Sequence, residues 1–96
     1  MSDSAAPAVF VNAGNDSPRP VKSTGVSVIG ENFPPGSAVN IKLGHGARGA
    51  VMVGPGGSFQ WDIEIRPPLG CNSPVVATVH GADGIVVTGE GDVFCP

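Results

Sequence analysis

The sequence predicts an all-β protein, a small antiparallel β-sandwich of about seven strands. Hydrophobic residues make up 41% of the 96 residues, and in several short runs they alternate with polar residues at the period of two that strands require. Fifteen Gly and ten Pro separate these runs at intervals of about 8 to 12 residues, as turns do in all-β proteins. The same pattern fits a barrel of six or seven strands, which remains the alternative architecture.

The chain length suits one small hydrophobic core. We divide the sequence into an N-terminal arm, residues 1–20, and a β domain, residues 21–96. The arm is rich in Ala, Ser and Pro and holds one apolar run that we expect to pair as an edge strand, either with this domain or with a neighbour. The candidate partner-binding residues of this run are Val9, Phe10 and Val11.

Residues 21–43 are expected to form two strands around the corner Pro34-Pro35-Gly36. The inward positions are Val26 and Val28, with Ile29 as a further candidate, on the first strand and Val39, Ile41 and Leu43 on the second. Asn40 and Lys42 are expected to face solvent. Phe33 is expected to anchor the corner in the core, while Gly36 supplies the turn conformation. The corner is therefore interpreted as a scaffold feature.

Residues 44–49 are read as a Gly-rich loop in which His45 and Arg48 are candidate partner-binding residues. A short strand at residues 51–53 and a turn at residues 54–57 follow. The clearest alternation lies in residues 59–65, where Trp61 has the spacing of a core residue. Pro67-Pro68 ends this strand because proline cannot donate to a central ladder.

The last hairpin determines whether the two cysteines meet. If residues 82–84 form a three-residue loop with Gly84 in the left-handed position, Gly81 faces Ile85 and Cys71 lies opposite Cys95. A two-residue loop would instead place Phe94 opposite Cys71. A Cys71–Cys95 disulfide would close a loop of about 25 residues and contribute roughly 3 kcal/mol. Two free thiols, as in a reducing cytoplasm, are the alternative, and the Cys and His spacing does not fit a zinc site.

No catalytic constellation is recognisable, so we expect no enzymatic activity and no cofactor or metal. Asp62 and Glu64 lie on the same side of a strand, as a glycosidase pair could, but a solvated face is the simpler interpretation. The turn Gly54-Pro-Gly-Gly57 has neither the Lys nor the helix of a phosphate-binding loop.

Charge and hydropathy exclude two classes of partner. The net charge is −3 and the five basic residues are scattered, which argues against nucleic-acid binding. No apolar span of about 18 residues exists, so we expect no membrane insertion. Asp3 replaces the basic start of a signal peptide, which leaves synthesis in the cytoplasm or a leader outside this sequence.

Three segments resemble the bacterial and phage immunoglobulin-like domains: Val28-Ile-Gly-Glu-Asn-Phe-Pro-Pro-Gly-Ser-Ala-Val39, Gly56-Gly-Ser-Phe59 and Val75-Val-Ala-Thr-Val79. The resemblance covers about residues 21–90. It implies an immunoglobulin-like sandwich, a fold that serves adhesins, carbohydrate-associated modules and virion surface proteins. The chain is also similar to the enediyne-binding apoproteins, which would imply a small-molecule carrier.

The resemblance therefore implies a non-catalytic structural or binding module. We expect a phage capsid decoration protein on the virion surface, with the major capsid protein or further copies of the chain as partner. The alternative is a secreted or cell-envelope immunoglobulin-like adhesion module, for which an oxidising compartment would explain a disulfide.

Overall fold

The computed structural model describes residues 6–15 and 22–95, and this part of the chain is all-β. Its seven strands are β1 (Ala8–Asn15), β2 (Thr24–Glu31), β3 (Ala38–Leu43), β4 (Arg48–Met52), β5 (Phe59–Ile65), β6 (Pro74–His80) and β7 (Val86–Phe94). A single 3-10 turn, η1 (Ala82–Gly84), joins β6 to β7. The predicted all-β class with about seven strands is confirmed.

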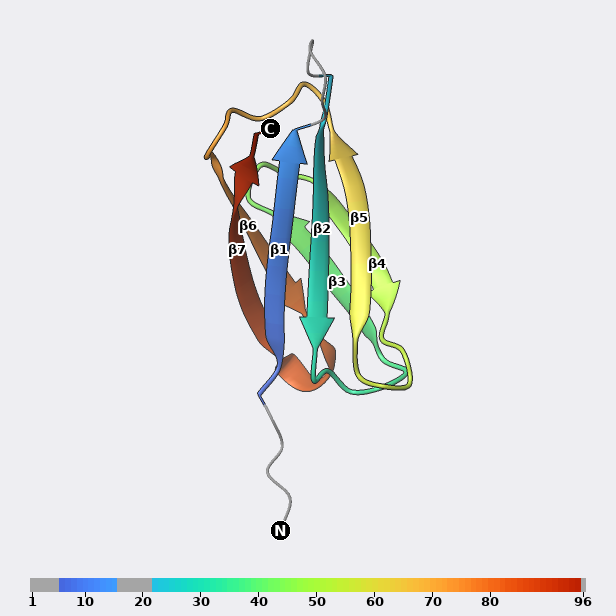
Figure 1. Cartoon of the computed structure of the whole chain (residues 1–96). Coiled ribbons are helices and arrows are strands. Elements are labelled where there is room, and N and C mark those ends of the chain that lie inside the picture. Colours follow the sequence, from blue (N-terminus) through green and yellow to red (C-terminus); the bar gives the residue numbers. More distant parts are fainter. Residues whose placement is uncertain (1–5, 16–21, 96) are drawn as a thin grey trace.

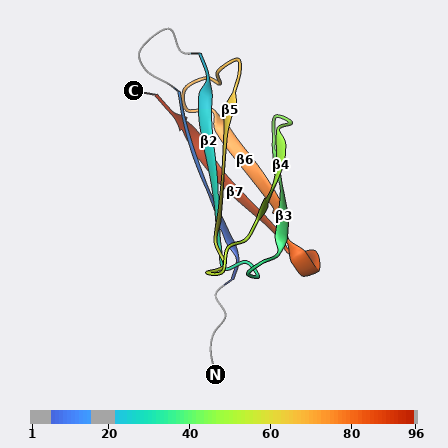
Figure 2. The same ribbon diagram turned by 90° about the vertical axis from the view of Figure 1, so that its right-hand side faces the viewer.

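The strands form one hydrogen-bonded sheet in the order β4-β3-β6-β7-β1-β2-β5. Neighbouring strands are antiparallel except β1 and β7, which are parallel. The sheet folds over, so that β1, β2 and β5 form one layer, β3, β4 and β6 form the other, and β7 passes between them (Figures 1 and 2). The two layers are continuous through β7, so the arrangement is closer to a partly open barrel than to two separate sheets.

The core lies between the layers and is built by strict alternation along β2, β3 and β6. Each of these strands turns every second side chain inward because successive side chains of a strand point to opposite faces. The buried hydrophobic residues are Val9, Val11, Val26, Val28, Phe33, Val39, Ile41, Leu43, Val53, Phe59, Val75, Ala77, Val79 and Val93. Five of the six inward positions predicted between residues 21 and 43 are in this core. The further candidate Ile29 is not, because it alternates with Val28 and lies opposite the exposed Phe10.

The corner between β2 and β3 is part of the scaffold, as predicted. Phe33 is only 2% exposed, and its ring packs edge-to-face on Phe59 with the ring centroids 5.2 Å apart. Gly36 has φ of +77°, a backbone conformation that residues other than glycine rarely adopt. Gly30 leaves room for the Phe59 ring, which occupies the space that a Cβ at Gly30 would need.

β4 and β5 form the open seam of the barrel. Within the described residues, β4 pairs only with β3, and β5 pairs only with β2. The indole of Trp61 on β5 lies over Gly49 on β4, so close that a Cβ at Gly49 would be 2.4 Å from the ring. Trp61 therefore packs against the core as predicted, but it stays half-buried because its strand is at an edge.

The N-terminal strand β1 pairs with this domain, which is one of the two alternatives expected for the run, but it is an interior strand rather than an edge strand. It lies between β7 and β2, and all eight of its residues pair with β2, from Ala8 opposite Glu31 to Asn15 opposite Thr24. Val9 and Val11 point into the core and are 8% and 7% exposed. Residues 8–15 thus belong to the sheet, while residues 1–5 and 16–20 lie outside the described residues.

Candidate binding faces

The β6–β7 hairpin has the register that brings the two cysteines together. The Gly81 N–H donates to the Ile85 carbonyl across 2.8 Å, and Gly84 has φ of +78°, as expected for a three-residue loop. The pairing continues to Pro74 opposite Asp92. Beyond it, Cys71 and Cys95 form a disulfide with a Cα–Cα distance of 5.6 Å. The predicted loop and the predicted disulfide are confirmed.

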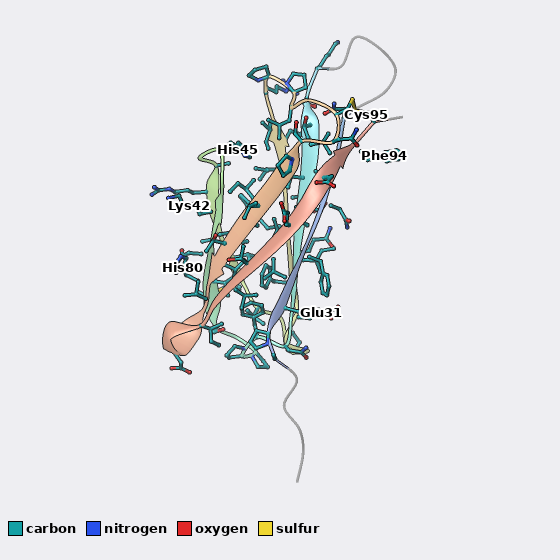
Figure 3. The ribbon with its side chains drawn as sticks, turned by 90° about the vertical axis from the view of Figure 1, so that its left-hand side faces the viewer. Glu31, Lys42, His45, His80, Phe94 and Cys95 are labelled. Carbon is teal, nitrogen blue, oxygen red and sulfur yellow. A yellow bond between two sulfur atoms is a disulfide. The ribbon has the colours of Figure 1, made fainter. Side chains whose placement is uncertain are left out.

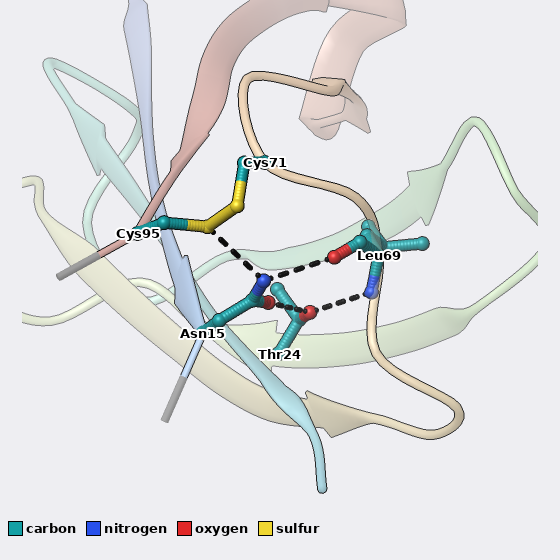
Figure 4. The surroundings of a disulfide bond; sticks show 5 residues. All are labelled: Asn15, Thr24, Leu69, Cys71 and Cys95. Carbon is teal, nitrogen blue, oxygen red and sulfur yellow. Dashed lines mark hydrogen bonds between the residues drawn. A yellow bond between two sulfur atoms is a disulfide. The ribbon is translucent and has the colours of Figure 1, made fainter. Parts of the chain in front are cut away.

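A part-buried polar cluster fixes the loop beside this disulfide (Figure 4). The Asn15 amide donates to the Leu69 carbonyl at 3.0 Å and lies 3.3 Å from the Cys95 sulfur. The fully buried Thr24 hydroxyl donates to the Asn15 side-chain oxygen and accepts from the Leu69 N–H at 2.8 Å. Each group of the cluster is satisfied, so we assign it a structural role.

One outer face presents aromatic residues to solvent. Phe10 on β1 is 51% exposed and lies directly opposite Ile29 on β2. Phe94, at the end of β7, is 71% exposed and lies beside the bare backbone of Gly14. Because a strand rises about 3.3 Å per residue, the two Phe side chains are separated by roughly 13 Å along β1. We call the surface formed by Phe10, Gly14, Ile29 and Phe94 the phenylalanine face.

A polar group centred on Asp62 lies on the same layer, on the outer side of β2 and β5. The Ser27 hydroxyl donates to the Asp62 carboxylate at 2.5 Å, and the Gln60 amide donates to both carboxylate oxygens at 3.1 Å. These hydrogen bonds, that of Ser27 first, lower the pKa of Asp62 below its ordinary value of 3.8. A carboxyl held in the ionised form is unsuited to act as a general acid at neutral pH. Glu64 forms an ion pair with Arg66 at 3.0 Å.

The opposite outer face, across β3, β4 and β6, carries positive charge. Lys42 lies directly opposite Arg48 on one side and Thr78 on the other, and Asn40 lies opposite His80. Lys42 and His80 project from this layer, away from the side that carries Phe94 (Figure 3). We call the surface formed by Asn40, Lys42, Arg48, Thr78 and His80 the cationic face.

Two adjoining shallow depressions hollow the cationic face. The first, of about 390 Å³, is lined by Asn40, Ile41, Lys42, Arg48, Gly49 and His80. The second, of about 350 Å³, is lined by Lys42, Leu43, Gly44, Val76, Thr78 and His80. Lys42 and His80 line both, so the depressions meet at these two side chains, and neither lining includes a carboxylate.

The predicted partner-binding residues do not form one site. Phe10 lies on the phenylalanine face and Arg48 on the cationic face, while His45 occupies the exposed turn between β3 and β4. Val9 and Val11 are in the core, so their side chains are not available to a partner. Sequence reasoning placed Lys42 toward solvent but did not name it as a binding residue, and it missed His80 and Phe94. Each of these two alternates with a buried apolar neighbour that could have marked it as outward-facing.

The described residues show neither a metal-binding cluster nor a membrane-spanning helix. Within residues 6–15 and 22–95, no three His, Cys, Asp or Glu side chains gather as metal ligands would. No helix in these same ranges is long and apolar enough to cross a membrane. Comparisons of the chain with protein families, characterised proteins and solved structures found no match.

Proposed function

We propose that this chain is a non-catalytic binding module with an immunoglobulin-like fold. The strand arrangement supports the fold assignment: β1, β2 and β5 share one layer, while β3 and β6 share the other with β7 alongside. Immunoglobulin-like sandwiches of the constant type place their first, second, fourth and fifth strands in one sheet and their third, sixth and seventh in the other, so β4 is the one strand that departs from this distribution. β4 pairs with β3, which extends the second layer by one strand.

The observation that carries the proposal is the phenylalanine face. Phe10 and Phe94 belong to strands in the interior of the sheet order, yet their side chains are 51% and 71% exposed. Burying such a ring is worth about 1.5–3 kcal/mol, so a partner that covers both would gain considerable binding energy. Aromatic residues are enriched at protein interfaces, and exposed apolar patches often mark them.

The partner we propose is the protein shell of a phage, to which the module would attach as a capsid decoration protein. The disulfide supports a working location outside the reducing cytoplasm, because such bonds persist in oxidising surroundings and Cys71 and Cys95 are bridged. The same disulfide favours the second candidate, a secreted or cell-envelope adhesion module.

Fractionation of the organism that produces the protein would separate these candidates. If the module decorates capsids, it should band with intact phage particles in a density gradient. If it is an adhesion module, it should be recovered from the culture medium or the cell envelope without particles. Recovery only from the cytoplasm, with both thiols reduced, would contradict both candidates.

A pair of variants tests the phenylalanine face itself. Replacing Phe10 and Phe94 together by Ser should weaken attachment by at least about 30-fold, because truncation of buried aromatic residues at an interface often costs more than 1 kcal/mol each. The matched control is Met52→Ser, which alters a side chain of similar exposure, 61%, on β4. Equal attachment of both variants and the unchanged protein would show that this face does not bind the partner.

A further inference from the structure

We propose that the cationic face binds an acidic polysaccharide through its carboxylate or sulfate groups. Given the non-catalytic binding role proposed above, this inference adds a ligand class at a second, separate surface. The phenylalanine face would attach the module, and the cationic face on the opposite layer (Figure 3) would then be turned outward.

The first support is the placement of two positive charges directly against each other. Lys42 on β3 and Arg48 on β4 are register partners on the same face of an antiparallel pair. Like charges in this position destabilise a sheet, since their Cβ atoms lie roughly 5 Å apart. An anion that binds between the two side chains removes this repulsion and gains hydrogen bonds from both.

The second support is that neither charge is neutralised within the described part of the chain. The ion pair found there joins Arg66 to Glu64, and no carboxylate lines either depression at Lys42. Six acidic residues lie in the described ranges, so the chain could have supplied a partner. The carboxylate nearest in register is Glu90, which lies opposite Val76 at the rim of the second depression and forms no ion pair with Lys42. On a protein of net charge −3, two adjacent cations without an ion pair are therefore a local departure from the overall charge.

The third support is the chemistry of the hollow itself. Lys42 and Arg48 offer several N–H donors, and the Asn40 amide, the Thr78 hydroxyl and the His80 ring surround them. Charged donors form the strongest hydrogen bonds with carboxylate and sulfate oxygens, and Arg can bind two oxygens at once. The Asn40 amide and the Thr78 hydroxyl can both donate to and accept from sugar hydroxyls.

The shape of the hollow favours a saccharide over a peptide. Extended peptides commonly add to a free sheet edge through backbone hydrogen bonds, whereas these depressions lie across the outer surface of β3, β4 and β6 and offer side-chain groups. Two depressions that meet at Lys42 and His80 also suit a chain of repeating units better than a single small anion.

Nuclear magnetic resonance titration of the ¹⁵N-labelled full chain tests the proposal. The probe is a heparin octasaccharide, with a neutral dextran oligosaccharide, inorganic sulfate and a polyglutamate peptide as comparisons. We expect the octasaccharide to shift the amide signals of residues 40–42, 48–49 and 78–80, to bind at least about tenfold more tightly than sulfate, and to weaken as salt is raised. The dextran should cause no shift at these residues.

Charge-neutralising variants complete the test. Lys42→Gln and Arg48→Gln should each lower octasaccharide affinity by at least about fivefold. The control Arg66→Gln makes the same change in net charge at a residue beyond β5, and it should change affinity less than twofold. Attachment through the phenylalanine face should be unaffected by any of the three, so failure of either proposal leaves the other standing.

Several outcomes would overturn the inference. Equal loss of affinity in all three variants would mean that only net charge matters. Shifts spread over the whole protein, or none, would mean that no site exists. Sulfate binding as tightly as the octasaccharide would identify a site for small anions, and tighter polyglutamate binding at the same residues would identify a site for acidic peptides.

Discussion

Thr24 shows how a single hydroxyl can hold two separate parts of this chain. It has no exposed surface and connects the Asn15 side chain to the Leu69 backbone. Thr24→Val preserves the shape but leaves the Leu69 N–H without this acceptor, so we expect a loss of about 1–3 kcal/mol in the free energy of unfolding. Urea unfolding measures this free energy. The control is Thr88→Val at an exposed position, which should change the free energy of unfolding by less than about 0.5 kcal/mol. An equally small change for Thr24→Val would show that the hydrogen bond is dispensable.

Asp62 contributes to the dependence of the protein's stability on pH. Its pKa is lowered chiefly by the Ser27 hydrogen bond, so the folded state binds the proton less readily than the unfolded chain. This contribution to stability is present above the ordinary pKa of 3.8 and is lost as the pH falls through the lower folded-state pKa. Ser27→Ala should raise the pKa of Asp62 towards 3.8, as measured by carboxyl ¹³C titration. Ser58→Ala, at an exposed position, should leave it unchanged, and a titration curve unaltered by Ser27→Ala would contradict the assigned cause.

The limits of sequence reasoning at this scale are clear from β1. The run Ala8 to Val11 is apolar throughout, so its residues carry no alternation to say which side chains face inward. The structure turns Val9 and Val11 to the core and Phe10 to solvent. In β3, by contrast, Asn40 and Lys42 alternate with apolar residues and their outward direction was predictable.

The β6–β7 hairpin is the element where local turn chemistry fixed a long-range contact. The left-handed Gly84 sets a three-residue loop, and counting along both strands from it leads to Cys71 and Cys95. We expect the intact mass of the protein to rise by about two hydrogens on reduction, because one S–S bond is replaced by two thiols. An unchanged mass would contradict the bridge.

Replacing both cysteines by Ser should also lower the free energy of unfolding by roughly 3 kcal/mol, because an unbridged chain of this separation gains conformational entropy when it unfolds. The two cysteines are separated by 24 positions in the sequence. Chemical denaturation of the double variant and of the oxidised protein, under the same conditions, gives the difference between their free energies of unfolding.

β7 depends on two glycines that no turn requires. A Cβ at Gly91 would lie 2.2 Å from the Val11 carbonyl oxygen, and one at Gly89 would lie 2.4 Å from that of Val9. These are backbone atoms and cannot rotate away, so Gly91→Ala should destabilise the fold by about 1–3 kcal/mol or more. Gly56→Ala, whose Cβ would meet no atom within 4 Å, should have little effect on the thermal midpoint. Similar midpoints for both variants would mean that β1 can move away from β7 at little cost.

The close crossing of β1 over β7 could not be predicted from the sequence. In the sequence, Gly89 and Gly91 look like residues of a weak strand or a loop. The reason for glycine at both positions is the close contact with the backbone of Val9 and Val11, which is seen only in the structure. The cationic face could not be predicted from the sequence either. Lys42, Arg48 and His80 are brought together by the pairing of β3 with β4 and β6 rather than by their spacing along the chain.

For the whole molecule, the inclusion of β1 (residues 8–15) in the sheet sets how much of the N-terminal segment the fold requires. Deleting residues 1–7 should leave thermal stability nearly unchanged, and we still expect it to weaken attachment to the partner. Deleting residues 1–15 removes β1 together with the core residues Val9 and Val11, and it leaves β2 without its hydrogen-bonding partner on that side. We expect this deletion to abolish the cooperative thermal transition because it opens the core. Circular dichroism on heating compares the two truncations, and a cooperative transition in the longer deletion would show that β1 is peripheral.

The parallel pairing of β1 with β7 has a mechanical consequence. The chain enters β1 at one end of the molecule and leaves β7 at the other (Figure 1), so tension applied to the two termini acts along both strands. Such a pull must slide β1 past its neighbours and load many hydrogen bonds at once, whereas pulling a hairpin open breaks them one by one. Cys95 passes the load directly to Cys71. A module tethered at both ends would therefore resist extension along its long axis.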